Sequence, residues 1–139
     1  MSFRAFLVTK EENNFSRNVV DRQLSDLPDN EVLIDVKYSS LNYKDGLSAT
    51  GNPGVTSVFP HTPGIDASGV VLESRDKDFT SGDEVIVIGF DLGMGTSGGF
   101  AERICVPSGW VVKMPHGLTM HSSMLLGTAG FTAAECIDK

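Results

Sequence analysis

Apolar residues along this chain fall into short runs that are separated by turn-forming residues. One stretch alternates apolar and polar positions, which is the period-2 pattern of a strand with one solvated face. Its apolar members are Val32, Ile34, Val36 and Tyr38. More continuous apolar runs occupy residues 5–9, 67–72, 84–89, 100–106 and 110–113. Six or more short strands with regular Gly- and Pro-rich turns predict a mainly β chain that forms a small barrel or sandwich.

Two segments predict helix. Residues 43–49 form a short candidate helix between two strands. In the last quarter of the chain, Thr119 is placed to cap a turn or two, and Thr128 is placed to cap a further helix. The apolar side chains on one face of that further helix are Phe131, Ala134 and Ile137.

The last predicted helix reaches Lys139 with its apolar face continuing and with no glycine or proline stop signal. About ten residues of isolated helix are marginal in water. One interpretation docks this helix on its own barrel. The interpretation that we favour is that residues 1–139 are the front part of a longer protein.

Composition narrows the range of partners. The 11 basic and 18 acidic side chains give a net charge of −7, which opposes non-specific binding to nucleic acid or to an anionic membrane. No apolar window of about 18 residues and no apolar leader occur, so we expect no membrane span and no signal peptide. Two cysteines, Cys105 and Cys136, are too few for a four-cysteine zinc site. A reducing cytoplasm is the expected location.

A cluster of polar residues follows the alternating strand, at Asn42, Tyr43 and Asp45. An amide, a phenol and a carboxylate at the end of a strand can orient a polar ligand. The alternative is structural, because Asn42 can cap the short helix while Asp45 faces its positive end. Spacing alone favours the structural interpretation.

Other residue types that often carry chemistry are interpreted as structural. Gly64 permits close backbone packing, and Asp66 is placed to receive backbone N–H groups as an orienting carboxylate. We interpret His61 as a solvated surface residue and Cys105 as a packed thiol. Residues 93–99 are glycine-rich but lack the P-loop ending and precede a strand, so we expect a mobile loop there.

Five short segments stand in a characteristic order along the chain. They are L-N-Y-K-D-G-L at 41–47, P-G-I-D-A-S-G-V-V at 63–71, G-D-E-V at 82–85, G-G-F-A-E at 98–102 and G-T-A-G-F-T-A-A at 127–134. Together they resemble the medium-chain dehydrogenase/reductase superfamily over nearly the whole chain. The first and last segments are most similar to its zinc-independent, quinone-oxidoreductase-like branch, and within that branch to the acrylyl-CoA reductase type.

The resemblance implies a GroES-like, partly open β-barrel with short helices, which is the substrate-side domain and occupies residues 1–126. Residues 127–139 then begin the connection to a Rossmann domain. That domain binds NADPH in the family, and its glycine-rich fingerprint does not occur in these residues. We therefore expect the 139 residues to lack most of the cofactor site and to be inactive alone.

Departures from the zinc-dependent relatives imply chemistry without a metal. Those enzymes place Cys at the position of Asn42, and Gly-His-Glu at the positions of Gly64, Ile65 and Asp66. Asn and Ile cannot supply the thiolate and the imidazole that a catalytic zinc ion needs. The resemblance therefore implies an enzyme with no metal site.

The implied reaction is NADPH-dependent reduction of an α,β-unsaturated carbonyl compound, with hydride transfer to the β-carbon. The resemblance assigns Asn42 and Asp45 to the catalytic pocket, with the Asn42 amide a candidate donor to substrate or cofactor. It assigns Tyr43 and Thr128 to cofactor binding near the nicotinamide. No residue is assigned as the proton donor.

Enones, quinones and acyl-CoA thioesters are the substrates that the resemblance implies, and a homodimer is expected for the full-length form. Two alternatives stay open: a stand-alone GroES-like binding module without catalysis, and a small β-barrel enzyme that uses Asp45 or Asp66 as a base. The apolar face with Phe131 and Ile137 is expected to favour association of the isolated chain.

Overall fold

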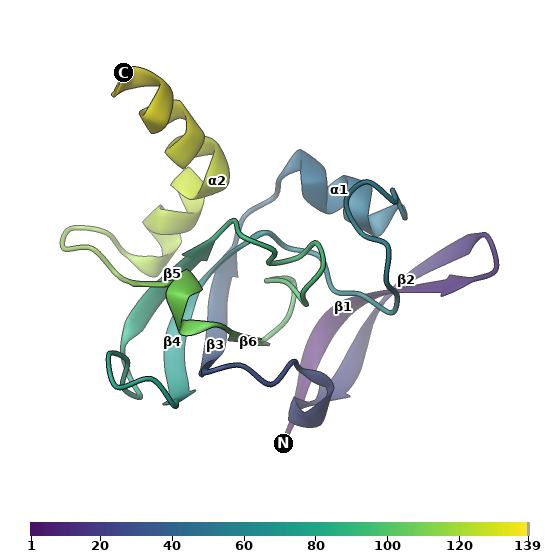
Figure 1. The fold of residues 1–139 in the computed structure, drawn as a ribbon, viewed down its shortest axis with the longest axis horizontal. Helices are drawn as coiled ribbons and strands as arrows, with labels where there is room; N and C mark the ends of the chain where they lie inside the picture. The colour runs from purple at the N-terminus through teal and green to yellow at the C-terminus, as the bar shows by residue number, and fades with distance from the viewer. Residues whose placement is uncertain (139) are drawn as a thin grey trace.

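The computed structural model describes residues 1–138 and shows a mainly β chain with two α-helices (Figure 1). The strands are β1 (Ser2–Glu11), β2 (Asn14–Gln23), β3 (Val32–Ser39), β4 (Asp66–Ser74), β5 (Glu84–Ile88), β6 (Arg103–Val106) and β7 (Val111–Lys113). The helices are α1 (Tyr43–Ala49) and α2 (Met120–Ile137), with short 3₁₀ turns at η1 (Leu24–Asp26) and η2 (Ser108–Trp110). Neither helix of the described part is long and apolar enough to cross a membrane.

The strands form two antiparallel sheets. β1 and β2 make a two-stranded ribbon, and the other five strands lie in the order β6-β3-β4-β5-β7. Single bridges from Ala5 to Ala101 and from Val8 to His61 join the ribbon to the rest of the chain. The mainly β, partly open architecture that the resemblance implies is confirmed.

The strand predictions hold for the five-stranded sheet, whose members all coincide with apolar runs. Its interior is an aliphatic cluster of buried side chains: Val32, Ile34, Ala67, Val71, Val85, Val87, Leu92, Ile104, Val106 and Val111. The ribbon was only half predicted, because β2 has no apolar run. Most β2 side chains are exposed, so apolar and polar residues do not alternate along this strand and its sequence does not predict it.

Both predicted helical regions are helical. α1 spans residues 43–49 as expected, and the Thr119 hydroxyl caps α2 by accepting the Ser122 N–H at 3.1 Å. α2 is broken at Gly127, where φ is 51° and ψ is −158°, and it ends at Ile137. Lys139, the last residue of the predicted 127–139 segment, lies outside the described residues.

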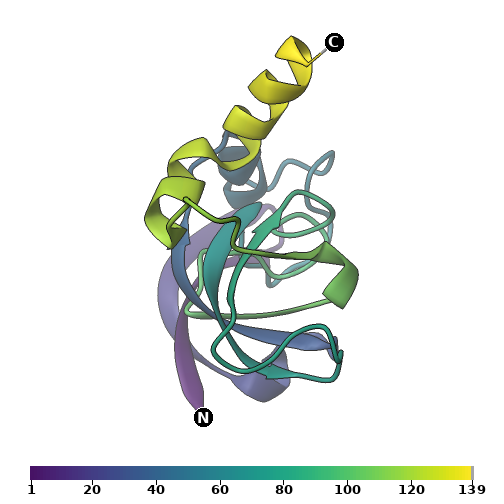
Figure 2. The same cartoon turned by 90° about the vertical axis from the view of Figure 1, so that its left-hand side faces the viewer.

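Two serine hydroxyls anchor the first half of α2 to the sheet. Ser68 on β4 donates to the Met120 carbonyl at 2.8 Å, and Ser40, just after β3, donates to the Met124 carbonyl at 2.7 Å. The second half of α2 projects away from the β-sheets (Figures 1 and 2). The break at Gly127 therefore separates an anchored segment from a projecting one.

Close backbone packing shapes the segment that enters β4. Gly64 has φ of +112°, and a Cβ atom there would lie 2.6 Å from the Phe100 nitrogen. Only glycine fits such a position without moving backbone, which confirms the role expected for Gly64. The contact fixes the path of the chain immediately before Asp66.

Candidate functional site

The candidate site lies at the edge of the five-stranded sheet where β3 ends and β4 begins. Ser39 pairs with Ala67, and Asp66 pairs with Ile88 at the end of β5. α1 follows β3 directly, and α2 packs on β3, β4 and β5. Segments that are far apart in the sequence thus meet at one edge (Figure 2).

Asp66 is the centre of this edge, and its side chain is fully buried. Its Oδ2 atom accepts hydrogen bonds from Asn42 Nδ2 at 3.0 Å and from the Thr128 backbone N–H at 2.9 Å. Its Oδ1 atom accepts the Thr128 hydroxyl at 2.5 Å. The prediction that Asp66 receives a backbone N–H group is confirmed, and the structure shows that the group comes from α2.

The break in α2 is built around the same carboxylate. Thr128 is the first residue of the second helical segment, so its N–H has no partner within that segment. Asp66 accepts this N–H and places negative charge at the positive end of the segment. The capping role predicted for Thr128 is therefore wrong, because the Thr128 side chain donates to Asp66 and Asp66 does the capping.

Asp45 is also buried, and its carboxylate faces backbone. It accepts the Asn42 backbone N–H at 2.8 Å and the Ile65 N–H at 3.0 Å. Burial raises the pKa of Asp45 above 3.8, while the hydrogen bonds from Asn42 and Ile65 oppose that rise. These contacts fit the structural alternative, in which Asp45 ties the start of α1 to the entry of β4.

The four predicted site residues therefore differ in their surroundings. Asn42 and Thr128 meet at Asp66, and Asp45 supports Asn42 through its backbone. Tyr43 differs from the other three, because it is the first residue of α1 and is 84% exposed. Sequence reasoning left Asp66 outside the site, although its position directly before an apolar strand was the signal that could have found it.

An open, mostly apolar hollow of about 570 Å³ adjoins Asn42 and α1. Its lining residues are Phe6, Leu41, Asn42, Asp45, Gly46, Ala49 and Phe100. The rings of Phe6 and Phe100 meet edge to face at 6.5 Å, and Leu41 is 89% exposed. Of the four predicted site residues, Asn42 and Asp45 line this hollow, whereas Tyr43 and Thr128 do not.

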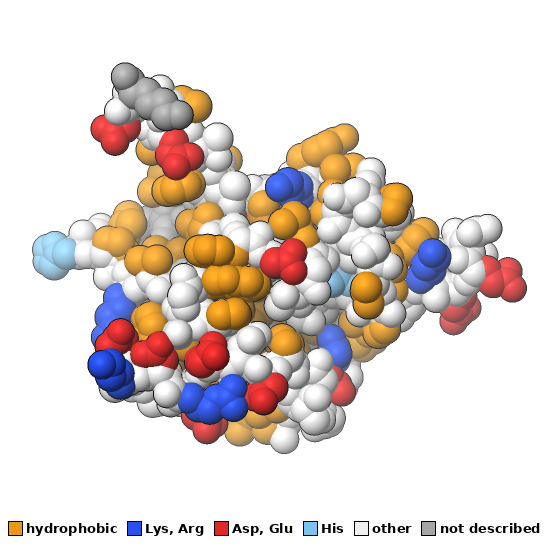
Figure 3. All heavy atoms as spheres, viewed as in Figure 1, with side chains coloured by type: hydrophobic (Ala, Val, Ile, Leu, Met, Phe, Trp, Pro, Cys, Tyr) orange, Lys and Arg blue, Asp and Glu red, His pale blue; other side chains and the backbone are white. Residues whose placement is uncertain are grey.

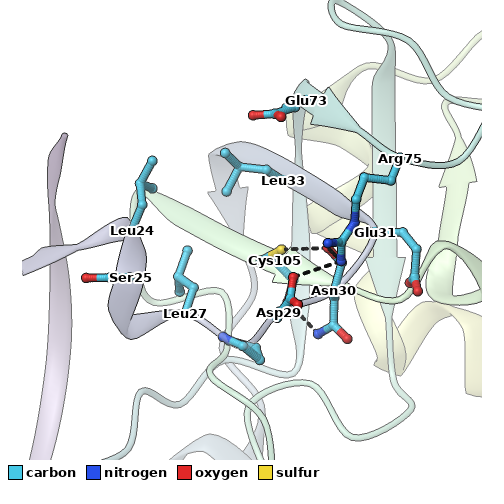
Figure 4. A pocket seen from close by; sticks show the side chains of 11 residues that line it. Leu24, Ser25, Leu27, Asp29, Asn30, Glu31, Leu33, Glu73, Arg75 and Cys105 are labelled. Atoms are coloured by element: carbon cyan, nitrogen blue, oxygen red, sulfur yellow. Dashed lines mark hydrogen bonds and ion pairs between the residues drawn. The ribbon is translucent and has the colours of Figure 1, made fainter.

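A second hollow, of about 410 Å³, lies away from this edge, between the η1 segment and the outer side of β3 and β6 (Figure 4). Leucine side chains form one side of it, and Arg75 bridges Asp29 and the Asn30 carbonyl on the other. Cys105 lies between them, half-buried, and burial raises the pKa of its thiol. Cys105 is thus a packed thiol, as expected, and this hollow contains no predicted site residue.

His61 is not the solvated surface residue that we expected. Its side chain is buried, its Nε2 lies 2.9 Å from the Gly93 carbonyl oxygen, and its backbone pairs with Val8. Burial lowers the pKa of His61 below 6.5. The β1 strand crosses this loop from a distant part of the chain, and no local pattern reports that contact.

The glycine-rich stretch is a loop, but its ends are closely packed. The Gly98 N–H donates to the Thr62 carbonyl at 2.7 Å, and the Gly99 N–H donates to the Gly64 carbonyl at 2.8 Å. Gly93 and Gly98 also lie against the backbone of Gly64. The sequence predicted a mobile loop, whereas several glycines of this loop allow its backbone to pack closely against the backbone of residues 62–64.

The donors to the Asp66 carboxylate are one amide, one hydroxyl and one backbone N–H group. Within residues 1–138, no group of three or more His, Cys, Asp or Glu side chains is arranged to hold a metal ion. After these contacts the Asn42 amide keeps its second N–H and its carbonyl oxygen, and the Thr128 hydroxyl keeps its acceptor lone pairs, so these groups can orient a polar ligand.

Known proteins resemble this chain in both sequence and fold. Residues 28–116 match the family described as the alcohol dehydrogenase GroES-like domain. The chain is 41% identical, over 133 residues, to the acrylyl-CoA reductase AcuI of Ruegeria pomeroyi, covering 94% of this chain and 40% of that protein.

Two crystal structures are similar over almost the whole chain. The Bacillus subtilis protein yhfP with NAD bound superposes with a TM-score of 0.95 at 40% identity, covering 99% of this chain and 42% of that one. The yhdH oxidoreductase from Salmonella enterica in complex with NADP gives 0.93 at 40% identity, with the same coverage. The chain thus spans about two fifths of the length of these relatives. It belongs to the alcohol dehydrogenase GroES-like domain family, in the quinone-oxidoreductase-like branch of the medium-chain dehydrogenase/reductase superfamily.

Proposed function

We propose that these residues form the substrate-side domain of a zinc-independent, NADPH-dependent reductase of α,β-unsaturated carbonyl compounds. The observation that carries the proposal is the meeting of Asn42 and Thr128 at the buried Asp66. The relatives support it, since one is named an acrylyl-CoA reductase and two are crystallised with NADP or NAD. Enones, quinones and acyl-CoA thioesters are the proposed substrates, and a cytoplasmic homodimer is the proposed full-length form.

The proposal divides the chain at the break in α2. Residues 1–126 are the substrate-side domain, and residues 127–139 begin the connection to a nucleotide-binding domain. Support comes from Gly127, where the helix changes direction and its anchored part ends. On this division the 139 residues hold one edge of the cofactor site and are inactive alone.

The residues present fit one end of a dinucleotide. Asn42 offers an amide, Tyr43 an exposed phenol and Thr128 a hydroxyl, whereas the glycine fingerprint that cradles a pyrophosphate is not in this sequence. Tyr43 and Thr128 would therefore hold the nicotinamide end. The cofactor, when bound, supplies the hydride that adds to the β-carbon of the substrate.

The chemical task of this domain is to orient the substrate and to stabilise charge. Negative charge builds on the carbonyl oxygen as the β-carbon is reduced, and a fixed donor lowers the energy of that state. The Asn42 amide is the proposed donor, and Asp45 holds the backbone of Asn42 in place. The apolar hollow beside α1 would receive the hydrocarbon part of the substrate.

Calorimetric titration with NADPH tests the proposal. We would titrate the 139-residue chain and the complete product of the gene that encodes it. We expect a dissociation constant in the micromolar range, about −8 kcal/mol, only for the complete product. Oxidation of NADPH by an enone, a quinone and acrylyl-CoA would then identify the substrate class.

Each result of the titration distinguishes between functions. Equal binding by the 139-residue chain would mean that these residues hold a complete cofactor site, and the division at Gly127 would be wrong. If neither protein binds NADPH, the reductase proposal fails and the stand-alone binding module replaces it. An Asp45→Asn variant that abolishes activity of the 139-residue chain would instead support a small independent enzyme.

A further inference from the structure

Asp66 is a fully buried carboxylate, and its hydrogen-bond partners among the described residues are uncharged groups. Within residues 1–138, no Lys, Arg or His side chain forms an ion pair with it. A buried charge without a partner is costly unless hydrogen bonds compensate. Here the compensation comes from three donors on two other elements, and two of these donors belong to predicted ligand-contacting side chains.

The contact with Asn42 decides which way its amide faces. Asp66 Oδ2 also accepts the Thr128 N–H, so it faces Asn42 as an acceptor and the NH₂ group of Asn42 is the part directed at it. The Asn42 side chain is half-buried, with Nδ2 at 3.0 Å from Asp66 Oδ2. Removing that oxygen would free the amide to rotate and exchange its donor and acceptor ends.

The contacts with Thr128 fix the start of the projecting helix. Both the backbone N–H and the hydroxyl of Thr128 point at the same carboxylate. Gly127 packs so closely here that a Cβ atom on it would lie 2.6 Å from Asp66 Oδ2. The position of Thr128 relative to Asn42 is thus determined through a single side chain.

We propose that Asp66 is a positioning residue, which holds the Asn42 amide and the Thr128 hydroxyl in the arrangement that the reaction needs. It acts through these two side chains and does not itself exchange a proton with the substrate. The inference rests on the proposed reductase function. The proposed role of Asp66 is to hold two side chains in place. A neutral side chain of the same shape must therefore be able to replace it.

The test compares Asp66→Asn with Asp66→Ala in the complete gene product. Asparagine keeps one oxygen that can accept the N–H groups of Asn42 and Thr128, and its own NH₂ can donate to the Thr128 hydroxyl, which also accepts. Alanine removes every partner. Asp83→Asn is the matched control, because that carboxylate accepts the Thr80 N–H and pairs with Lys113 at the opposite end of β5.

We expect the hydride-transfer rate in single turnovers to stay within about fivefold of wild type for Asp66→Asn and to fall about 100-fold for Asp66→Ala, the size of loss that misplaced groups cause. The Michaelis constant for NADPH should stay near the wild-type value for Asp66→Asn and rise for Asp66→Ala, because Thr128 is a proposed cofactor contact that Asp66 holds. Hydrogen exchange at the Thr128 amide should accelerate in Asp66→Ala only. Asp83→Asn should match wild type in rate and exchange.

Three results would overturn the proposal. A rate for Asp66→Ala equal to wild type would show that the arrangement is not needed. An inactive Asp66→Asn with a protected Thr128 amide would show that the charge, or a proton on it, takes part in the reaction. Unchanged Thr128 exchange in Asp66→Ala would show that no positioning occurs.

The failure of the reductase function is a separate result. If the wild-type gene product reduces no enone, quinone or acrylyl-CoA, the proposed function fails, while Thr128 exchange and the NMR signals of the Asn42 NH₂ group still decide whether Asp66 positions them. If Asp66→Ala does not fold, Asp66→Asn decides alone. If Asp66→Asn keeps both its hydride-transfer rate and the protection of its Thr128 amide, the proposal is supported. If the rate is lost while the Thr128 amide stays protected, the proposal is refuted.

Discussion

Individual buried polar residues join segments of this domain that lie far apart in the sequence. Asp45, Asp66 and His61 are all nearly inaccessible, and each has its polar atoms bound to backbone or side-chain groups from another segment. Because an unpaired polar group is expensive to bury, such residues fix the relative positions of the segments that they join. For Asp45 and His61, whose pKa values burial shifts, titration is therefore coupled to folding.

His61 gives the clearest pH prediction. Burial lowers its pKa below 6.5, so below that pH the unfolded chain binds a proton that the folded chain excludes. The free energy of unfolding should therefore fall as the pH drops below 6.5, by up to about 1.4 kcal/mol per pH unit from this group. Urea denaturation of wild type and His61→Gln between pH 7 and pH 5 measures it.

The His61→Gln variant should lack the contribution of His61 titration, so its free energy of unfolding should depend less steeply on pH than that of wild type. His116→Gln is the control, because His116 is exposed in the loop before α2. Parallel pH profiles for wild type and His61→Gln would contradict the prediction.

At the scale of elements, the main finding is that α2 consists of two segments with different tasks. The first is capped by Thr119 and anchored through Ser40 and Ser68. The second begins at Thr128, under Asp66, and projects from the sheet edge. The positive φ of Gly127 joins them at a point where a Cβ atom would lie 2.6 Å from Asp66 Oδ2.

Gly127→Ala should therefore be strongly destabilising. A Cβ atom would lie 2.6 Å from Asp66 Oδ2 and 2.7 Å from Ser40 Oγ, in addition to the strain of φ at 51°. Backbone strain and overpacking each cost about 1–3 kcal/mol. Denaturant titration should show a loss of about 2 kcal/mol beyond that of the control Gly117→Ala.

Gly117 suits the comparison because its φ is also positive, at +90°, while a Cβ atom there meets nothing within 4 Å. The control thus carries the strain without the contact. Equal losses for the two variants would mean that the contacts at Gly127 relax without cost.

At the scale of the whole molecule, an apolar surface stands on the projecting half of α2. Phe131 is 58% exposed and Ile137 is 85% exposed, and apolar side chains are visible there in Figure 3. Exposed apolar groups that lie together on one face favour association. The second segment makes a surface of this kind that the β-sheets do not cover.

The 139-residue chain should therefore associate with a second copy as its concentration rises. Sedimentation velocity should show a growing dimer fraction that the double variant Phe131→Gln, Ile137→Gln reduces. Val112→Gln is the control, since Val112 is 57% exposed on β7 and lies outside this face. A chain that stays monomeric at all concentrations would contradict the prediction.

The sequence by itself determined the parts of this protein that depend on neighbouring residues. Alternation and apolar runs predicted the strands of the five-stranded sheet, and the Thr119 cap and the extent of α1 follow from local chemistry. The ordered motifs identified the family. In one of these motifs the structure gives a physical reason for the residue type, because a Cβ atom on Gly64 would lie 2.6 Å from the Phe100 nitrogen.

Only the tertiary structure decided the rest, and the reason is distance along the chain. β2 exists because β1 pairs with it in a register of ten residues, although its own side chains are mostly solvated. His61 pairs through its backbone with Val8, and the role of Asp66 depends on Asn42 and Thr128. A carboxylate gains its partners only when chain folding brings distant donors to it, so no local pattern can distinguish a surface aspartate from one that organises a site.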